Sequence, residues 1–588
     1  MDSCEFKEKL NTAFKYHQQG NFSEAEIIYN ELLEQEPDNA NVLNLLGLIF
    51  HQYKQYDKAV EYIKRAAIIA PSDYFYFNLG NMYLCKKEIN DAIESFKKAV
   101  EIKPDNADAH LSLGDAYREK HENDNAVGCY RQVIKYDKTN YMAYLALGTL
   151  LLEMEQVEEA SETIEEVLRI KPDEAEILLN LGLYYEKENM YDKAFEIYNK
   201  ILQLKPDSYK AYLNLSNVYY ERNDYNKAAE CCKQALSINP DYADAYLNLG
   251  NAYKGRKDTR KALECYEKAM SIQPDHADAN FNFSTTCLLN EIYDAGWIKY
   301  EWRFLKKEIN YPVLPEFTQP LWDGRSIEGK TIYVCYEQGF GDVLQFSRYI
   351  PVLASMGANV IFKCPITQER LFKQSNLNAE IIGSNFPDYL LKFDTYTYLM
   401  SIPLLLGTNT KNIPLSEGYL KAEKSLVEQY REKYFNNDSF KIGICWTSSV
   451  KGVKKRKIPL EYFYKFAGIK NVKLYSLQVG YTVQELEKVP QEIEIVDLGN
   501  TFNDFADTAA AVENLDLVIS TDTSVVHLTG ALGKPVWGLI TYIPCWRWLQ
   551  DRDDSPWYKS MRLFRQKYPG NWEEVMQRVY ITLLKNLS

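Results

Sequence analysis

The sequence of 588 residues lacks three features that would place it outside the cytoplasm or build it around metals or disulfides. It has no run of about 18 apolar residues, the length that a membrane-spanning helix needs. Its first residues, Met1–Lys7, have neither the basic nor the apolar segment of a secretory signal. The eleven cysteines show no CxxC spacing, so we expect no disulfide framework and no zinc site. These absences predict a cytoplasmic protein without a membrane span.

Positive charge is also scarce. Lys and Arg number 68 against 82 Asp and Glu, and the formal net charge is −14. This balance argues against a general affinity for nucleic acid. A chain of this length is too long for one core and should form three or more structural units.

The first half repeats one unit at steps of 34 residues, once of 33. In most units a Gly and then an Ala stand at fixed offsets before a Pro, which indicates two antiparallel helices whose small residues let them touch. The pattern resembles the tetratricopeptide repeat. It predicts an α-solenoid over residues 1–290, with about eight units plus a cap. The prolines that mark the units are Pro37, Pro71, Pro104, Pro172, Pro206, Pro240 and Pro274, with Lys138 in the one missing place.

Several of these units carry an Asn two residues before the Gly position. An Asn amide both donates and accepts, so a ladder of them can pair with the backbone of an extended peptide. In this respect the array resembles the repeats of nucleocytoplasmic O-GlcNAc transferases; the alternative is that these side chains only face water. Because Ser112 and Ala146 interrupt the ladder, we expect a peptide channel only over the C-terminal repeats. The predicted acceptor-peptide residues are Asn180, Asn214, Asn248 and Asn282, and Asn78 stands before the interruption.

The repeat stops near residue 290. Residues 291–325 are predicted to form a capping helix and a connector. From Thr331 onward, short apolar runs alternate with helix-length segments, which is typical of parallel βαβ units. We expect two Rossmann-like lobes, at 326–435 and 436–588, with ligands bound beyond the carboxyl ends of the strands.

Three loops in this half follow predicted strands. The first contains Gly339, Gly341 and Asp342; its glycines permit a tight turn and the close approach of a ligand. Asp342 is a candidate general base or a helix cap. The second loop carries Ser448, Ser449, Arg456 and Lys457, which form either a diphosphate clamp or a solvated charge run.

The third loop lies between an apolar strand and a short helix, at Asp522, Thr523, Ser524 and His527. A helix N-terminus offers free N–H groups and partial positive charge to a phosphate, and an imidazole one turn later can donate to the same anion. The alternative is that Thr523 or Ser524 caps the helix and His527 packs against the next lobe.

Taken together, the loops resemble those of glycosyltransferase family 9, the heptosyltransferase-like enzymes of GT-B fold, in the branch fused to tetratricopeptide repeats. The segments that carry the resemblance are "GFGDVLQFSRYIP" and "STDTSVVHLTGALGKPVWGL", and it covers about residues 325–575. The resemblance implies that Asp342 is the catalytic base and that Asp522, Thr523, Ser524 and His527 bind the nucleotide-sugar. It also implies a basic diphosphate-binding residue at Arg456, with Lys457 as the adjacent alternative.

The chain departs from the family pattern at two positions, where Ser524 replaces a Gly and Thr529 replaces an Ala. Ser524 narrows the space beside the phosphates, so the donor need not be the ADP-heptose of the family. Trp546–Trp548 and Asp553–Tyr558 recur in the repeat-fused branch, where they shape an acceptor or base pocket or pack between the lobes.

The sequence therefore predicts an inverting glycosyltransferase that moves a sugar from a nucleotide-sugar to a polypeptide held by the repeats. No DxD-type acidic pair stands at the expected donor site, so we expect neither a metal nor another cofactor. Two alternatives remain: the acceptor is a glycolipid or polysaccharide, or the chain is a repeat scaffold with an inactive transferase half. The sugar, the nucleotide and a homo-oligomeric state are left open.

Overall fold

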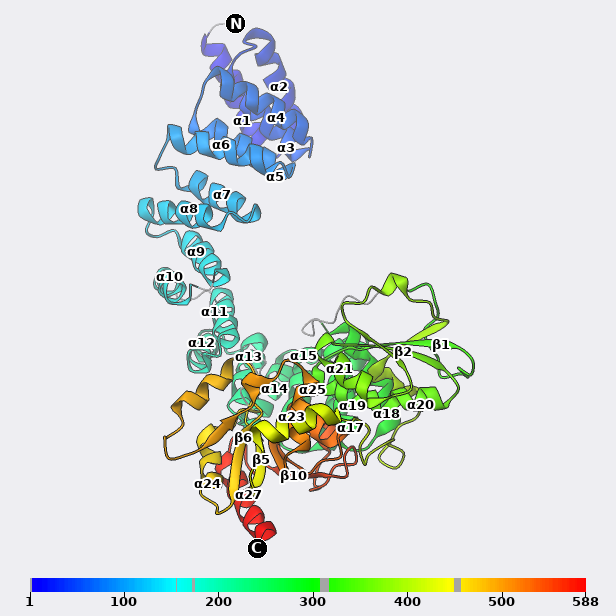
Figure 1. Cartoon of the computed structure of the whole chain (residues 1–588). Coiled ribbons are helices and arrows are strands. Elements are labelled where there is room, and N and C mark those ends of the chain that lie inside the picture. Colours follow the sequence, from blue (N-terminus) through cyan, green and yellow to red (C-terminus); the bar gives the residue numbers. More distant parts are fainter. Residues whose placement is uncertain (1–2, 155, 172–174, 307–316, 449–455) are drawn as a thin grey trace. The chain divides into compact units, whose positions relative to one another are not determined.

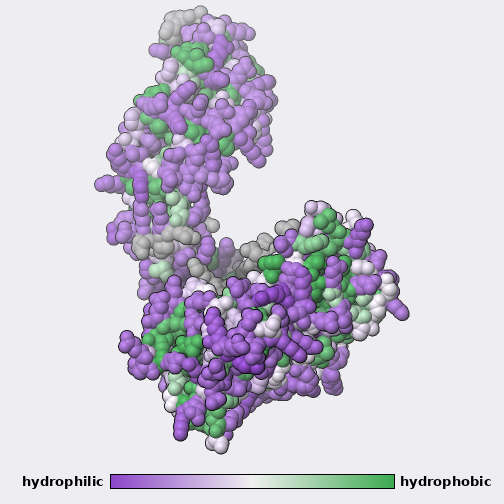
Figure 2. Space-filling model, in the orientation of Figure 1, coloured by the Kyte–Doolittle hydropathy of each residue, from purple (hydrophilic) through white to green (hydrophobic). Residues whose placement is uncertain are grey.

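The computed structural model describes residues 3–154, 156–171, 175–306, 317–448 and 456–588 (Figure 1). The chain forms two compact units, Met1–Asn214 and Leu215–Ser588. No described helix is long and apolar enough to cross a bilayer. In the view of Figure 2, hydrophilic residues cover most of the visible face, in keeping with the net charge of −14.

Consecutive helices pair in an antiparallel solenoid from the first described residues to Tyr300, as the repeat pattern predicts. The repeat helices are α1 (Ser3–Gln18), α2 (Phe22–Gln35), α3 (Ala40–Gln52), α4 (Tyr56–Ile69), α5 (Asp73–Cys85), α6 (Ile89–Ile102), α7 (Ala107–Glu119), α8 (Asn123–Tyr136), α9 (Tyr141–Glu153), α10 (Val157–Ile170), α11 (Ala175–Lys187), α12 (Tyr191–Leu204), α13 (Tyr209–Glu221), α14 (Tyr225–Ile238), α15 (Ala243–Gly255), α16 (Thr259–Ile272), α17 (Ala277–Leu289) and α18 (Tyr293–Tyr300). The repeats α14 to α18 belong to the second compact unit.

The repeated glycines lie where the two helices of a unit touch. A Cβ added to Gly114 would lie 2.6 Å from Cε1 of Tyr130, and one added to Gly250 would lie 2.5 Å from Cε1 of Tyr266. Both tyrosines are fully buried. The glycine in each unit is therefore a close-contact residue, and a larger side chain would push the two helices apart.

Two parallel sheets follow the solenoid, which confirms the predicted α/β region. The first has the order β3-β2-β1-β4, with β1 (Thr331–Cys335), β2 (Asn359–Cys364), β3 (Glu380–Gly383) and β4 (Thr395–Tyr398). The second has the order β10-β9-β8-β5-β6-β7, with β5 (Phe440–Cys445), β6 (Val472–Ser476), β7 (Ile495–Asp497), β8 (Leu517–Thr521), β9 (Val536–Ile540) and β10 (Met561–Arg565).

This region also contains helices, of which α19 and α26 position the site. They are α19 (Phe340–Phe346), α20 (Ile350–Ser355), α21 (Ile366–Ser375), α22 (Ile402–Leu405), α23 (Lys424–Tyr434), α24 (Tyr464–Ala467), α25 (Phe505–Glu513), α26 (Ser524–Ala531) and α27 (Trp572–Leu587). The helix expected after Asp342 is interrupted by a 3₁₀ turn at Ser347–Tyr349. Pro351 stands in the first turn of α20, and its ring cannot continue the preceding helix.

The predicted boundaries at residues 290, 325 and 435 remain predictions. The division into compact units falls elsewhere, after Asn214, because α17 and α18 pack directly on the α/β region. Trp297 of α18, for example, donates from Nε1 to the carbonyl of Thr408 at 2.7 Å.

We predict opposite effects for two glycine substitutions in the first unit. Gly114→Ala should lower the free energy of unfolding by about 1–3 kcal/mol, because its Cβ collides with Tyr130. Gly128→Ala, on the exposed face of α8 with nothing within 4 Å of an added Cβ, should raise it by about 0.5–1 kcal/mol.

Far-UV circular dichroism during thermal unfolding tests both substitutions. All nine tryptophans lie in the second unit, so the fluorescence transition should not shift in either variant. Equal stability of the two variants would show that the glycine is not a close-contact residue.

Candidate functional site

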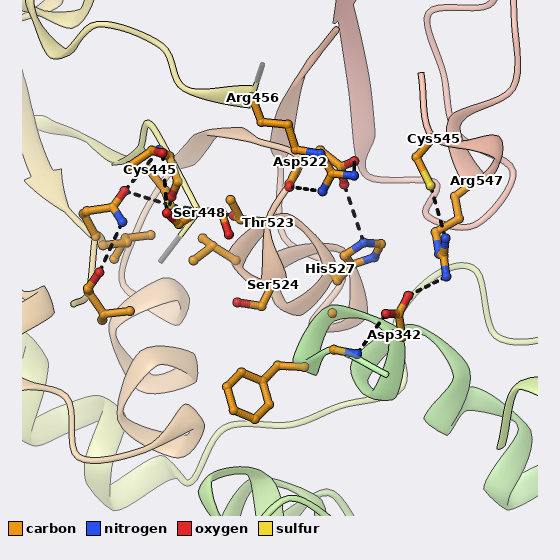
Figure 3. A pocket seen from close by; sticks show the side chains of 18 of the residues that line it. Asp342, Cys445, Ser448, Arg456, Asp522, Thr523, Ser524, His527, Cys545 and Arg547 are labelled. Carbon is orange, nitrogen blue, oxygen red and sulfur yellow. Dashed lines mark hydrogen bonds and ion pairs between the residues drawn. The ribbon is translucent and has the colours of Figure 1, made fainter. Parts of the chain in front are cut away.

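A cavity of about 270 Å³ lies where five loops meet in the second unit. Each loop follows the carboxyl end of a parallel strand: β1 in the first sheet, and β5, β6, β8 and β9 in the second. In the second sheet, β6 and β8 flank β5 on opposite sides, and such a switch point is where α/β sheets bind ligands. The predicted site residues that line the cavity are Gly339, Gly341, Asp342, Ser448, Arg456, Asp522, Thr523, Ser524 and His527 (Figure 3).

Of the predicted donor-binding residues that the structure describes, Lys457 does not line the cavity. It pairs with Glu485 at 2.5 Å, so of the two basic alternatives it is Arg456 that faces the cavity. Ser449 lies outside the described residues.

Helix α19 from the first sheet packs directly on α26 from the second. A Cβ added to Gly341 would lie 2.9 Å from Cδ2 of His527 and 3.6 Å from Cα of Ser524. Neither Gly339 nor Gly341 has a positive φ. Gly341 therefore lets the two helices approach each other because it has no side chain, and neither glycine is required by the backbone conformation of the turn.

The N-terminus of α26 faces the cavity. Thr523 occupies the N-cap position, and in the part of the chain that the structure describes its side chain caps no amide of the helix. Its hydroxyl is instead 3.1 Å from Oγ of Ser520 and 3.7 Å from Sγ of Cys445. The first-turn N–H groups and the positive end of the helix dipole are thus left to meet a ligand.

Arg456 is held at this helix end by Asp522. Its Nη1 donates to the Asp522 carbonyl at 3.0 Å, and its Nη2 lies 3.3 Å from Oδ2 of the same residue. The backbone carbonyl of Arg456 accepts from the Thr521 hydroxyl at 2.9 Å. These bonds fix a guanidinium group at the start of α26, where an anion would meet both.

His527 is buried, with 4 % of its surface exposed. Its Nδ1 is 3.0 Å from the Tyr558 hydroxyl, its ring stacks on Trp548 at 5.1 Å, and its Nε2 is 3.9 Å from Oδ1 of Asp522. Burial, and then the positive charges of Arg547, Arg348 and Arg456, hold the pKa of His527 well below its ordinary value. The imidazole is therefore neutral near pH 7. The ring packs against the aromatic loop and also lines the cavity, and its donation to an anion remains a prediction.

The Asp342 carboxylate caps its own helix and also accepts a hydrogen bond from a residue that follows the second sheet. Its Oδ2 accepts the N–H of Gly339 at 3.1 Å, and its Oδ1 accepts a hydrogen bond from Nη2 of Arg547 (Figure 3). The capping role weighed from the sequence is present, and the same carboxylate also faces the cavity.

Sequence reasoning missed Arg547, Cys545 and the segment Leu477–Val479, all of which line the cavity. Leu477–Val479 follows β6 directly, so the rule on strand ends could have identified it. Arg547 stands between two tryptophans that suggested packing. That interpretation holds for the aromatic side chains, because Trp546, Trp548, Trp557 and Tyr558 are all buried.

Sequence reasoning also missed Glu337, which anchors the loop after β1. It is fully buried and accepts two hydrogen bonds from Arg303, at 2.8 Å and 3.0 Å, and one from the Met400 N–H at 2.9 Å. Arg303 lies in the 3₁₀ segment that follows α18. A buried charge pair of this kind stays favourable only while both partners are present, so the last repeat and the loop after β1 hold each other in place.

Three asparagines of the ladder donate to asparagines that lie outside the ladder, on the preceding repeat. Asn248 donates to Asn217 at 2.6 Å, and Asn282 donates to Asn251 at 3.0 Å. In the first unit, Asn78 donates to Asn44 at 3.0 Å; Asn180 is exposed and Asn214 is half-buried. The bonds join neighbouring repeats, and the acceptor-peptide role of Asn180, Asn214, Asn248 and Asn282 remains a prediction.

Among the described residues, no group of three or more His, Cys, Asp or Glu side chains is placed to hold a metal ion. Among the described residues, the charged groups that line the cavity are two acids, Asp342 and Asp522, and two guanidinium groups, Arg456 and Arg547. Each acid is paired with one guanidinium.

We predict that His527 makes the second unit less stable in acid. Since the pKa of His527 in the folded state lies below 6.5, its ordinary value, the unfolded chain binds a proton that the folded chain does not. The stabilisation is fully present above pH 6.5 and is lost as the pH falls below it. In His527→Asn, which retains an acceptor for Tyr558, the tryptophan-fluorescence unfolding midpoint should fall less between pH 7.5 and pH 5.5. Identical pH dependence in the two proteins would contradict a neutral, buried imidazole.

Comparison with known proteins supports the repeats directly. Sequence models of the tetratricopeptide repeat match residues 16–74, 80–120, 109–140, 145–209, 186–234, 216–255 and 243–276. The solved structure of YrrB, described as a TPR protein with an unusual peptide-binding site, is 24% identical. It covers 32% of this chain and 96% of its own, with a TM-score of 0.28, which is too low to carry an argument.

Three curated proteins are similar over parts of the chain. Protein FlbA of Caulobacter vibrioides is 26% identical over 320 residues, which are 49% of this chain and 52% of that protein. BBSome complex member BBS4 of Bos taurus is 33% identical over 81 residues, 14% of this chain and 16% of its own. Protein O-mannosyl-transferase TMTC1 of Homo sapiens is 29% identical over 98 residues, 16% of this chain and 11% of its own. The chain spans about half the length of FlbA and far less of the other two. Tetratricopeptide repeats thus make up most of residues 16–276.

Proposed function

We propose that this chain is a glycosyltransferase that moves a sugar from a nucleotide-sugar to a polypeptide, with inversion at the anomeric carbon and without a metal ion. The observation that carries the proposal is the arrangement of the cavity. A helix N-terminus with Arg456 lies on one side, and a carboxylate from a separate parallel sheet lies on the other. The two sheets would then be the two lobes of a GT-B fold of the family 9 type.

In this mechanism the donor diphosphate lies at the start of α26. The first-turn N–H groups and Arg456 would stabilise the negative charge that develops on the leaving group, which is the usual large contribution in such reactions. Where Tyr558 donates to Nδ1 of His527, Nε2 carries the proton and can donate to the same oxygens. These groups supply the charge that a metal ion supplies in other transferases.

Asp342 would act on the acceptor from the opposite side. Its carboxylate takes the proton of the acceptor hydroxyl, the oxygen attacks the anomeric carbon, and the bond from that carbon to the diphosphate breaks. Attack from the face opposite the leaving group inverts the configuration. Ser524 is the first residue of α26 and lies close to Gly341, where its side chain would limit the size of the sugar.

Similarity to a protein named as an O-mannosyl-transferase adds limited support for glycosyl transfer, because it covers 16% of this chain. The repeats support a protein acceptor or partner, since such arrays bind proteins.

Two measurements in sequence test the proposal. First, tryptophan fluorescence during thermal unfolding is recorded with a panel of nucleotide-sugars, since a ligand at 100 times its Kd stabilises by about 2.7 kcal/mol. Second, the stabilising donor is labelled and incubated with the chain and cell lysate, with and without EDTA. Label in protein, retained with EDTA, is expected. Label in lipid or polysaccharide would favour a glycan acceptor, and a chain that neither binds nor hydrolyses any donor would be an interaction scaffold.

We predict that Asp342→Asn lowers kcat by about 10²–10⁴-fold, because the amide cannot take a proton. Donor affinity, measured by calorimetry, should stay close to that of the wild type, since Asn can still cap the Gly339 N–H. Asp438→Asn, at an exposed carboxylate outside the cavity, is the matched control and should leave kcat unchanged. Full activity of Asp342→Asn would refute Asp342 as the base.

We also predict that Asn248→Ala and Asn282→Ala raise KM for a polypeptide acceptor and leave donor hydrolysis unchanged. Asn78→Ala removes the same kind of bond between neighbouring repeats but lies before the interruption at Ser112 and Ala146. It should therefore leave KM unchanged. An equal rise of KM in all three variants would show a general effect on the solenoid rather than a peptide channel.

A further inference from the structure

Arg547 forms a bridge between the two sheets at the cavity. It lies in the 3₁₀ segment Trp546–Trp548 that follows β9, and 7% of its surface is exposed. Its Nε donates to Oε1 of Gln345 at 2.8 Å, its Nη2 donates to Oδ1 of Asp342, and its Nη1 lies 3.1 Å from Sγ of Cys545. Gln345 and Asp342 both belong to α19, which follows β1 of the first sheet. The guanidinium group therefore binds this helix through two hydrogen bonds.

These contacts leave the Asp342 carboxylate little freedom to rotate. Oδ2 is held by the Gly339 N–H at 3.1 Å and Oδ1 by Arg547. Each carboxylate oxygen has a second acceptor position, so the group can still face a ligand in the cavity. Lys could not replace Arg here, because only the planar guanidinium fork reaches Gln345 and Asp342 together.

The position of Arg547 is itself fixed from the repeat side. The Arg547 guanidinium lies 4.4 Å from the ring centroid of Trp546. Trp546 in turn packs edge-to-face on Trp297 and Tyr300 of α18, with ring centroids at 5.3 Å and 5.7 Å. A continuous set of contacts therefore runs from the last repeat helix through Trp546 and Arg547 to Asp342.

We propose that Arg547 is the positioning residue of the transfer reaction, which holds the Asp342 carboxylate oriented toward the acceptor hydroxyl. This inference rests on the proposed function. It assigns Arg547 to the chemical step rather than to donor binding, since its hydrogen bonds go to Gln345 and Asp342 of α19 and to Cys545.

The test uses Arg547→Ala in the full chain, with the donor and the acceptor that the nucleotide-sugar panel and the labelling experiment identify. Because a misplacement of about 1 Å can cost about 10²-fold in rate, kcat should fall by about that factor while donor Kd stays unchanged. Guanidinium ion at concentrations far below those that unfold proteins should restore part of kcat by occupying the vacated position. An equal concentration of sodium chloride should not.

Three controls separate positioning from packing. Arg552→Ala, at a half-buried arginine of the same loop that pairs with Asp554, should retain wild-type kcat. The double variant Arg547→Ala/Asp342→Asn should gain nothing from guanidinium, because the carboxylate to be positioned is gone. Arg547→Lys, which retains the charge and the stem, should unfold at the wild-type midpoint and have a kcat between those of the wild type and Arg547→Ala.

An Arg547→Ala variant with the kcat of the wild type would overturn the inference. So would a fall in kcat that guanidinium does not restore, in a variant whose unfolding midpoint is unchanged. If Arg547→Ala does not fold, a wild-type kcat in Arg547→Lys would likewise overturn it. A wild-type chain that transfers no sugar would instead refute the proposed function, so the two failures are distinguishable.

Discussion

The close contact of α19 with α26 is the constraint on which the site depends. The two helices begin at the ends of strands in separate sheets, and only the absence of a side chain at Gly341 lets them meet at His527. This contact brings the loop after β1 against the loops of the second sheet and closes one side of the cavity. It also buries His527, whose neutral imidazole follows from that burial and from three neighbouring guanidinium groups.

In the part of the chain that the structure describes, the charged side chains of the cavity form two ion pairs. Arg456 is held by Asp522 at the start of α26, and Arg547 is held by Asp342 across the cavity. Fixed partners of this kind keep charged groups in position at little reorganisation cost when a substrate arrives. The same logic extends outward, since Arg303 and Glu337 fix the loop after β1 from the last repeat. The repeats therefore help to build the cavity, beyond any role in binding a partner.

Much of the fold could be predicted from the sequence because its signals are local. The small residues and prolines of the repeat identified the solenoid. The apolar runs predict strands at Thr331–Tyr336, Asn359–Lys363, Lys441–Cys445, Val472–Leu477, Leu517–Ser520 and Val536–Ile540, where the structure has β1, β2, β5, β6, β8 and β9. The strands β3, β4, β7 and β10 were missed, since they are short or carry polar and aromatic residues instead of aliphatic runs. The turns inside the repeats were equally silent, because residues such as Lys54, Lys87 and Asn223 adopt the left-handed conformation without being glycine.

The site was predictable to the extent that strand ends determine it. The loops of Arg456 and Asp522 could be grouped because the carboxyl ends of parallel strands share one edge of a sheet. The loop of Asp342 follows a strand of the other sheet, and it was joined to them through the resemblance to a two-lobed transferase. Arg547 could not be, since its partner Asp342 is 205 residues away in the chain and its neighbours are buried tryptophans. The family departure at Thr529 has a local explanation, because its hydroxyl donates to the Val525 carbonyl at 2.8 Å. Ser524 is not explained in this way and faces the cavity.

The central claim is that this cavity holds a nucleotide diphosphate at the start of α26, opposite Asp342. A crystal structure of the full chain with the nucleotide-sugar that stabilises it tests this most directly. We expect diphosphate oxygens within about 3 Å of the backbone nitrogen of Ser524 or Val525 and of the Arg456 guanidinium, with the sugar directed toward Asp342. A nucleotide bound elsewhere, or one whose sugar points away from Asp342, would contradict the account.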